Sequence, residues 1–298
     1  MPSLVPPIKC QGIKTKLVPA IRALVGANIT GRWIEPFCGS GVVAFNLRPE
    51  RALLADTNQH IIAFYQAIQS GDLTPDRVAR YLEEEGDSLR RQGESHYYTV
   101  RERFNATHDP LDFLFLNRAC FNGVMRFNRR GAFNTPFCRK PERFAPAYIT
   151  KIANQVRAVR QILQQRDWTF AVADFRETLS QTTKNDVVYA DPPYMGRHAD
   201  YFNTWSEASE QALIRLLKRL PCPFVLSTWQ ENEFRRNPAI EAHWTEEGLH
   251  LLSIEHFYHV GSSEDLRHGM TEALITNVPL PGAYVKPEKP RQYALEIA

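Results

Sequence analysis

The chain has 298 residues, 43% hydrophobic and 23% charged, which is an ordinary globular composition with enough chain for a sizeable core. Its net charge of +3 is too small to indicate nucleic acid by itself. The five cysteines and nine histidines form no CxxC, HExxH or similar cluster, so we expect reduced thiols and no metal site. No signal sequence or membrane-length apolar run is visible, which predicts a cytoplasmic protein without a membrane partner.

Hydrophobic periodicity predicts alternating helices and strands in the first part of the chain. In chain order these are a helix at 14–25, a strand at 32–34, a helix from 42 to 47, a strand at 52–55 and a helix at 58–68. After residue 71 this alternation of helices and strands stops. Residues 72–103 are charged, with helices predicted around 75–84, and residues 122–143 are rich in Gly, Asn, Arg and Phe without a clean period.

The alternation resumes after this stretch, which predicts one α/β domain carrying an insertion. The later elements are helices at 148–164 and 207–219 and strands at 168–172, 187–189, 224–227, 249–258 and 273–276. We predict an open, mostly parallel sheet. Residues 1–60 and 146–298 would form a discontinuous catalytic domain, and residues 61–145 would form the insertion.

A chemically unusual motif follows the strand at 187–189. Asp191 is followed by Pro192 and Pro193, which cannot continue a strand ladder or a helix, and then by Tyr194. The carboxyl edge of an open α/β sheet is where ligands bind. A carboxylate, rigid carbonyls and a flat ring at that edge suit a planar base that carries an amino group. The alternative is a structural strand end with a turn Asp and a packed Tyr.

A glycine loop follows the strand at 32–34. Gly39 and Gly41 fit a loose G-x-G-x-x-G/A pattern, in which the backbone can approach a ligand and a helix amino terminus offers free N–H groups. Asp56 ends the next strand and could accept hydrogen bonds from ribose hydroxyls, and Asp174 adds a third acid to this edge. A dinucleotide site or a plain tight turn would also fit the loop. Three edge acids without a phosphate-binding lysine favour S-adenosylmethionine.

The insertion contains a strongly basic stretch between Asn117 and Arg143. This stretch contains seven basic residues and one acid, which gives a local charge of +6. Four phenylalanines and several asparagines are interleaved with the basic residues. Arg and Asn side chains read guanine and adenine edges, and aromatic rings can wedge between bases or stack on them. A solvated basic hairpin with its phenylalanines in a small core is the other interpretation, and some of these rings must be core in either case.

Taken together, these motifs resemble the Dam-type, alpha-group DNA adenine methyltransferases over nearly the whole chain. The resemblance rests on segments that occur in the family's order: residues 9–14 (KCQGIK), 35–41 (EPFCGSG), Asp56, 117–118, 121–128 (FNGVMRFN), 131–137, 173–175 and 191–194 (DPPY). It implies a Rossmann-like S-adenosylmethionine-dependent methyltransferase sheet with an inserted, mainly helical DNA target-recognition domain. It also implies methyl transfer from S-adenosylmethionine to the exocyclic amine of a flipped adenine in double-stranded DNA.

The resemblance assigns site residues by position. Catalysis would fall on Asp191, Pro192 and Tyr194. Cofactor binding would fall on Cys10, Lys14, Glu35, Pro36, Phe37, Gly39, Gly41, Asp56, Asp174, Phe175 and Asp191. With the basic stretch, DNA binding would fall on Lys9, Arg118, Phe121, Asn122, Val124, Arg126, Asn128, Arg130, Asn134 and Arg139.

Two departures from the family pattern are visible. Cys10 stands where many relatives have Trp, and Ile13 replaces a glycine. After Pro136-Phe137 the chain has Cys138-Arg139-Lys140 in place of the Gly-Arg-Tyr-Lys usual in GATC readers, so the recognition sequence stays open. Double-stranded DNA is the expected partner of a cytoplasmic, nucleoid-associated monomer, and a cognate restriction endonuclease sharing the site is a further candidate.

Four alternatives stay open on sequence alone. The same chemistry would serve the exocyclic amine of cytosine, or a base in RNA. A DNA-binding regulator could keep the fold without turnover, although an intact 191–194 motif argues against it. A dinucleotide-dependent oxidoreductase is the last alternative.

Overall fold

The computed structural model describes residues 3–26, 29–194, 205–232, 236–257, 269–279 and 293–294, and its centre is one mixed sheet. Its strands are β1 (Trp33–Glu35), β2 (Arg51–Asp56), β3 (Asp167–Val172), β4 (Val187–Ala190), β5 (Phe224–Asn232), β6 (His250–Phe257), β7 (Gly269–Thr276) and β8 (Tyr293–Ala294). Their order across the sheet is β3-β2-β1-β4-β5-β7-β6-β8.

The sheet changes direction at β1, and this defines where a ligand can bind. β2 and β4 both pair in parallel with β1, so the strand order reverses there, with β2 and β3 on one side of β1 and β4 and β5 on the other. In open α/β sheets such a switch point opens a crevice at the carboxyl ends of the strands. β5 is followed by the antiparallel pair β7 and β6. A six-stranded dinucleotide fold would have another parallel strand there, so the observed order disfavours the oxidoreductase alternative.

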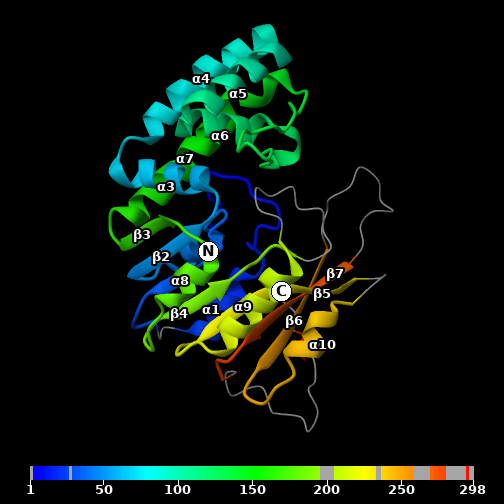
Figure 1. The fold of residues 1–298 in the computed structure, drawn as a ribbon. Coiled ribbons are helices and arrows are strands. Elements are labelled where there is room, and N and C mark those ends of the chain that lie inside the picture. Colours follow the sequence, from blue (N-terminus) through cyan, green and yellow to red (C-terminus); the bar gives the residue numbers. More distant parts are fainter. Residues whose placement is uncertain are drawn as a thin grey trace.

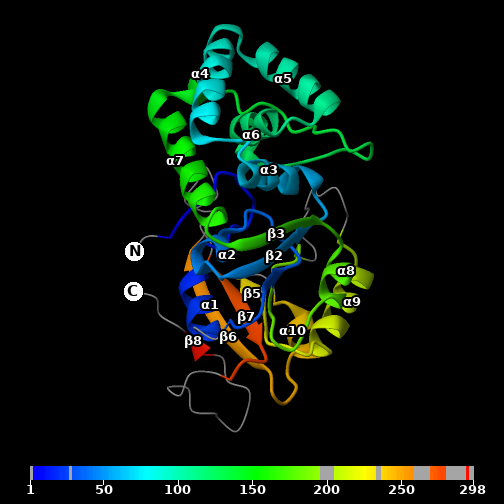
Figure 2. The ribbon, with the colours of Figure 1, turned by 90° about the vertical axis from the view of Figure 1, so that its left-hand side faces the viewer.

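Alternating side chains divide the core into two layers, one on each face of the sheet. On β1, Trp33 belongs to the core shared with α1 (Val18–Val25) and α2 (Val42–Leu47). Its neighbour Ile34 belongs to the core on the other face, because successive strand residues point to opposite sides. That second core lies under α8 (Phe175–Ser180), α9 (Glu207–Lys218) and α10 (Pro238–His243). Figure 2 shows these two sets of helices on either side of the sheet.

Helices between β2 and β3 form a separate layer at one end of the molecule (Figures 1 and 2). They are α3 (Gln59–Ser70), α4 (Pro75–Gln92), α5 (Glu94–Thr107), α6 (Pro110–Ala119), the 3₁₀ turns η1 (Phe121–Gly123) and η2 (Pro141–Phe144), and α7 (Pro146–Leu163). α7 packs against α4 and α3, and α3 also contacts β2 and β3. The helical layer is therefore joined to the sheet through α3 and α7.

Local sequence explains where these helices begin and break. Thr74 caps α4 with its side chain, Asp109 caps α6, and each helix has Pro in its first turn, where the missing N–H costs nothing. Gly93 separates α4 from α5 with a φ of 62°. An ion-pair network then ties the three helices together: Arg103 on α5 donates to Asp112 at 2.6 and 2.9 Å and to Glu85 at 2.7 Å.

The amino-terminal segment fastens the helical layer to the sheet domain. The main chain of Lys9 exchanges two hydrogen bonds with the side chain of Asn117 on α6, at 2.8 and 2.9 Å. The main chain of Leu4 exchanges two more with Asn46 on α2, at 2.8 and 2.9 Å. Because both amides are anchored to the same segment, residues 4–9 are held against α2 and α6 together.

The predicted α/β architecture is confirmed, and the differences are local. The strands at 187–189 and 52–55 and the helices at 58–68 and 148–164 occur within a few residues of their predicted bounds. α5, α6, α8 and α10 were not predicted, because α8 and α10 have only six residues, α5 carries a weak apolar stripe, and α6 is buried almost throughout and so lacks a polar face. No helix in the described part of the chain is long and apolar enough to cross a membrane.

Candidate active site

Asp191 lies directly after β4, at the switch point of the sheet. Val188, Tyr189 and Ala190 pair with Phe224, Val225 and Leu226 of β5, so the residue after β4 lies beside Ser227 while β5 continues to Asn232. Ser227 on β5 consequently faces Asp191 and donates a hydrogen bond to its Oδ1 at 2.8 Å. The next residue, Pro192, is buried, which fixes the backbone just after the carboxylate.

A buried lysine joins Asp191 to a second acid. Lys14, only 4% exposed, places its Nζ 3.1 Å from Oδ1 of Asp191 and 3.4 Å from Oε1 of Glu272, which is 1% exposed. It also donates to the carbonyl of Gly12 at 2.9 Å. Glu272 comes from β7, which pairs with β5 in antiparallel fashion. Two carboxylates and one ammonium give this acid cluster (Lys14, Asp191 and Glu272) a formal charge of −1.

Tyr194 is held on the same cluster. Its hydroxyl donates to Oε1 of Glu272 at 3.0 Å, and Nζ of Lys14 lies 4.7 Å from the centre of its ring. The ring is half-buried, so part of it remains accessible. A hydrogen bond at one end and a cation over one face together restrict the ring's orientation.

The surroundings raise the pKa of Asp191. Burial is the main cause, and the negative charge of Glu272 acts in the same direction. Lys14 and the hydrogen bond from Ser227 oppose it without cancelling it. Asp191 is therefore easier to protonate than an ordinary aspartate, and its ionised form depends on Lys14.

The glycine loop after β1 is closed by hydrogen bonds to β2. The amide of Cys38 donates to the carbonyl of Ala55 at 2.8 Å, and the amide of Gly39 donates to Oδ2 of Asp56 at 2.9 Å. Gly39 and Gly41 have φ angles of 49° and 65°, values that glycine adopts without strain. A Cβ on Gly41 would lie 2.8 Å from the ring of Phe45, so close packing also demands glycine there.

Asp56 and Glu35 both support this loop. Asp56 accepts from the amides of Gly39 and Asn58 with different oxygens, and burial raises its pKa. Glu35 is 1% exposed, and its Oε1 accepts from the indole of Trp33 and the amide of Ala44, both at 2.8 Å. Burial raises the pKa of Glu35 to about 8. Glu35 thus links β1 to the start of α2.

Three aromatic rings form a stack beside the loop. Phe37 packs face to face with Phe175 at a centroid distance of 5.5 Å, and Trp205 meets Phe37 edge-on at 5.5 Å. Asp174 precedes Phe175 and caps α8, but its side chain is 45% exposed and pairs with Arg176 at 3.1 Å. The aromatic stack therefore lies by the loop, while the carboxylate of Asp174 faces solvent and a local arginine.

The amino-terminal segment covers the loop from another side. Cys10 is half-buried, and a Cβ built on Gly39 would lie 3.9 Å from its Sγ. Burial, followed by the charges of Asp56 and Asp191, raises the pKa of the Cys10 thiol. Cys10 is thus a neutral thiol close to both carboxylates.

The basic stretch forms a hairpin anchored by its phenylalanines. Phe127 pairs with Phe133 and Cys120 with Phe137 through isolated bridges, and these three phenylalanine rings are buried. Phe121 is different: it is 55% exposed at the start of η1. The core interpretation is therefore correct for three rings, while the fourth projects from the surface as a wedge would.

Arg126 is held in a fixed position within this hairpin. Its Nε donates to Oδ1 of Asn134 at 2.8 Å, and its main-chain amide donates to Oγ1 of Thr135 at 3.1 Å. Thr135 in turn donates to the carbonyl of Val124 at 2.8 Å. Asn128 accepts from the amides of Arg130 and Ala132 and so closes the tip of the hairpin. Besides Phe121, the predicted DNA-binding residues of the hairpin that are exposed are Asn122, Asn128, Arg130 and Arg139.

Arg118 was predicted to bind DNA, but the structure places it in the interior. It is 4% exposed, and its guanidinium donates to the carbonyl of Pro7 at 2.7 Å, to Gln155 at 2.7 Å and to the hydroxyl of Tyr148 at 3.2 Å. A buried guanidinium whose donors already have protein partners cannot make a surface contact with DNA. Arg118 instead joins the amino-terminal segment to α7.

Comparison with known proteins adds family information to this geometry. Residues 11–260 match the family described as D12 class N6 adenine-specific DNA methyltransferases. The chain belongs to this family.

Its relatives differ in the share of their length that this chain covers. The DNA adenine methylase of Serratia marcescens is 32% identical over 225 residues, covering 72% of this chain and 77% of that protein. Modification methylase StsI of Streptococcus sanguinis is 28% identical over 283 residues, covering 91% of this chain but 42% of that protein. The chain thus spans less than half the length of StsI. Among solved structures, the rRNA methyltransferase aviRa of Streptomyces viridochromogenes matches 88% of this chain and 84% of that chain at 14% identity, with a TM-score of 0.37.

Two residues of this candidate site were not predicted from the sequence. Ser227 and Glu272 touch Asp191 or its partners, but they lie 36 and about 80 residues further along the chain. A signal existed only for Glu272: it is the single charged residue of the closing strand, and a buried charge needs a partner. Ser227 carried no signal, because a serine at a strand end is common.

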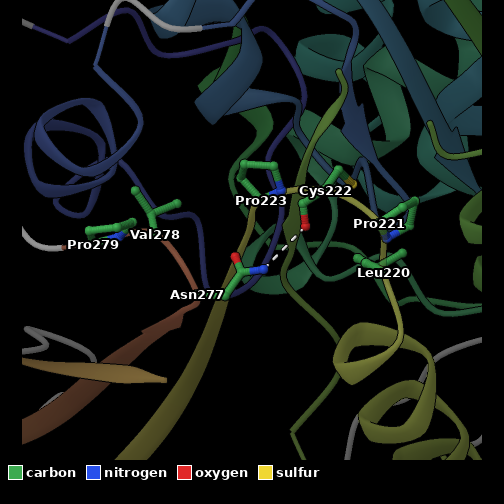
Figure 3. Close-up of a pocket in the computed structure, with 7 residues that line it drawn as sticks. All are labelled: Leu220, Pro221, Cys222, Pro223, Asn277, Val278 and Pro279. Carbon is green, nitrogen blue, oxygen red and sulfur yellow. Dashed lines mark hydrogen bonds between the residues drawn. The ribbon is translucent and has the colours of Figure 1, made fainter. Parts of the chain in front are cut away.

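A separate concavity lies at the opposite edge of the sheet. Its volume is about 280 Å³, and it occupies the amino end of β5 and the carboxyl end of β7. Its lining residues, drawn in Figure 3, are Leu220, Pro221, Cys222, Pro223, Asn277, Val278 and Pro279. The side-chain amide of Asn277 donates to the carbonyl of Cys222 at 3.2 Å across it. It contains no charged side chain and is distant from Asp191 along both strands, so it contributes nothing to the acid cluster.

Proposed function

We propose that this chain transfers a methyl group from S-adenosylmethionine to the N6 amine of adenine in double-stranded DNA. The observation that carries the proposal is the acid cluster with Tyr194 at the carboxyl end of β4, in a chain of the D12 family. The deciding experiment is nucleoside mass analysis of duplex DNA treated with the protein and labelled cofactor. N6-methyladenine is the expected product. N4-methylcytosine, or no modified nucleoside, would contradict the proposal.

Asp191 and Pro192 would activate the amine by accepting hydrogen bonds from its two N–H groups. The exocyclic amine is a weak nucleophile because its lone pair is delocalised into the ring. Ser227 and Lys14 both hold Oδ1 of Asp191, and among the described residues Oδ2 has no hydrogen-bond partner. Oδ2 is then the acceptor for one amine proton, and the carbonyl of Pro192 accepts the other. This geometry favours a tetrahedral nitrogen with a localised lone pair, so positioning and electrostatics carry the rate.

Tyr194 would stack on the adenine, which has to leave the duplex to reach Asp191. The hydrogen bond to Glu272 fixes the ring before the base arrives, and Lys14 already occupies one face. We assign Glu272 a positioning role because it holds both Tyr194 and Lys14. Losing it would leave the charge on Lys14 and the ring of Tyr194 less constrained.

The residues around the loop fit S-adenosylmethionine. When bound, this cofactor supplies an electrophilic methyl group on a positively charged sulfur. The acid cluster has a formal charge of −1, which attracts a sulfonium and repels a pyrophosphate. Asp56 retains lone pairs for ribose hydroxyls, and Phe37 with Phe175 offers an aromatic surface for the adenine of the cofactor. Cys10, Lys14, Glu35, Pro36, Gly39 and Gly41 line the same region in this proposal, and Asp174 would have to exchange Arg176 for the cofactor.

The hairpin would read the DNA. Phe121 is exposed where a wedge could fill the gap left by a flipped base, and Asn122 and Val124 lie beside it. Arg126 is pre-oriented by Asn134, as a base-reading arginine should be. Lys9, Asn128, Arg130 and Arg139 complete the proposed DNA surface.

A further inference from the structure

Three cations surround one phenol where the amino-terminal segment meets α6 and α7. Arg118 and Arg143 each donate to the hydroxyl of Tyr148 at 3.2 Å, and their guanidinium carbons lie 5.7 and 4.8 Å from its ring centre. The ammonium group of Lys9 lies close enough to interact electrostatically with Tyr148 and with both arginines. We call Lys9, Arg118, Arg143 and Tyr148 the cationic cluster. Lys9, Arg143 and Tyr148 are half-buried, so each keeps some access to solvent.

No carboxylate balances this charge among the described residues. Besides Tyr148, Arg118 donates only to the carbonyl of Pro7 and to Gln155, and Arg143 donates only to the carbonyl of Arg118. The buried Lys14, by contrast, is paired with two acids, Asp191 and Glu272. Three close positive charges with only neutral partners repel one another, and an anion would relieve that repulsion.

The helix dipole of α7 and the pKa shifts within the cationic cluster also indicate an excess of positive charge there. Tyr148 lies in the first turn of α7, an 18-residue helix with no acidic residue in that turn, so the positive end of the helix dipole adds to the cluster. Burial and the neighbouring arginines lower the pKa of Lys9, and burial lowers the pKa of Arg118. Burial raises the pKa of Tyr148, but the surrounding cations outweigh it and leave that pKa lowered. All three shifts reduce the positive charge of the cluster.

The cationic cluster also lies next to the proposed wedge. A Cβ on Gly123 would come within 2.8 Å of the side chain of Lys9, and Gly123 ends the turn that begins with Phe121. A phosphate bound by the cluster would therefore belong to the DNA strand close to the flipped nucleotide.

We propose that Lys9, Arg143 and Tyr148, with the buried charge of Arg118 behind them, bind one backbone phosphate of the DNA. This site rests on the proposed function, since it takes duplex DNA as the ligand. Phosphate contacts fix the register of a protein on DNA and carry no base information. The cluster would thus position the duplex for the hairpin, whatever sequence the hairpin reads.

The test measures DNA affinity as a function of salt for Arg143→Gln. A short mixed-sequence duplex is titrated by fluorescence anisotropy, without cofactor, between about 0.05 and 0.2 M salt. Loss of one phosphate contact should reduce the slope of log Kd against log salt by about 0.9, which at about 0.1 M salt corresponds to roughly eightfold weaker binding. Arg143→Lys retains the charge and should keep the slope, although it loses the planar fork. The matched control is Arg157→Gln, which removes an equal charge from an exposed position on the same helix and should leave the slope unchanged.

Several outcomes would overturn this site. Equal slopes for Arg143→Gln, Arg157→Gln and the unchanged protein would show that no phosphate is held there. A loss of affinity for S-adenosylhomocysteine in calorimetry, with an unchanged salt slope, would assign the cluster to the cofactor carboxylate instead. Should Arg143→Gln not fold, Lys9→Gln carries the same measurement, and an unchanged slope in that variant would refute the site.

The proposed function fails separately. Binding needs no methyl transfer, so a protein that binds DNA with the predicted slope but methylates nothing would refute the enzyme and keep the site. Normal methylation, combined with a salt slope that Arg143→Gln leaves unchanged, would refute the phosphate site and keep the proposed enzyme.

Discussion

Glu35 makes folding stability depend on pH in a direction unusual for a carboxyl group. Its side chain is 1% exposed and accepts two hydrogen bonds, yet burial is the larger effect and raises its pKa from 4.5 to about 8. The folded protein therefore binds the Glu35 proton more tightly than the unfolded chain does. The stabilisation from this proton is fully present below the unfolded pKa of 4.5 and is lost as pH rises through the folded pKa of about 8.

The substitution Glu35→Gln isolates this effect. The amide is neutral at all these pH values, and its oxygen can still accept from Trp33 and Ala44. At 1.36 kcal/mol per pH unit, the raised pKa corresponds to about 5 kcal/mol of unfolding free energy lost between pH 4.5 and 8. Denaturant unfolding without cofactor should show Glu35→Gln near the unchanged protein in stability at pH 5. It should be more stable by several kcal/mol at pH 8.

Parallel stability profiles would refute this reasoning. If the two proteins lose the same free energy between pH 5 and 8, Glu35 titrates normally and its burial has no electrostatic cost. Glu84→Gln, at an exposed position on α4, is the control and should leave the pH profile unchanged.

Three further predictions concern the site and the hairpin. The charge of Glu272 raises the pKa of Asp191, so Glu272→Gln should lower that pKa and move the acidic limb of the pH profile of kcat/KM to lower pH. An unchanged acidic limb would show that Glu272 does not influence the ionisation of Asp191. Phe121→Ala alters an exposed ring and should change stability by less than about 0.5 kcal/mol while slowing methyl transfer roughly tenfold, and equal rates would end its role as a wedge. Arg126→Ala should cost about 1–3 kcal/mol at a single base pair in a panel of duplexes, whereas a uniform loss over all duplexes would make Arg126 a phosphate contact.

The sequence was most informative where structure depends on neighbouring residues. Asp191 and its prolines follow a run of β-formers, and Asp56 ends another, so strand ends and their acids could be placed at one sheet edge without knowing the fold. The glycine loop was found for the same reason, because Gly39 and Gly41 need backbone angles that their neighbours do not. Lys14 was reached only through the family resemblance.

What the sequence did not reveal depends on contacts across long stretches of chain. Glu272 meets Lys14 only because β7 inserts beside β5, an arrangement that no local pattern encodes. Arg118 has the same residue type as the exposed arginines of the hairpin, and only its position on the inner face of α6 separates a buried clamp from a DNA contact. The domain boundaries at residues 60 and 146 stay a prediction.

The central claim is that Asp191 activates an adenine amine, and labelled methyl transfer by Asp191→Asn tests it most directly. The variant keeps the size of the side chain and can still accept from Ser227, so it should fold. Replacing one preorganised acceptor should lower the rate of N6-methyladenine formation by roughly 10²–10³-fold, with DNA affinity maintained. A folded Asp191→Asn protein that forms N6-methyladenine at a rate close to that of the unchanged protein would contradict the account.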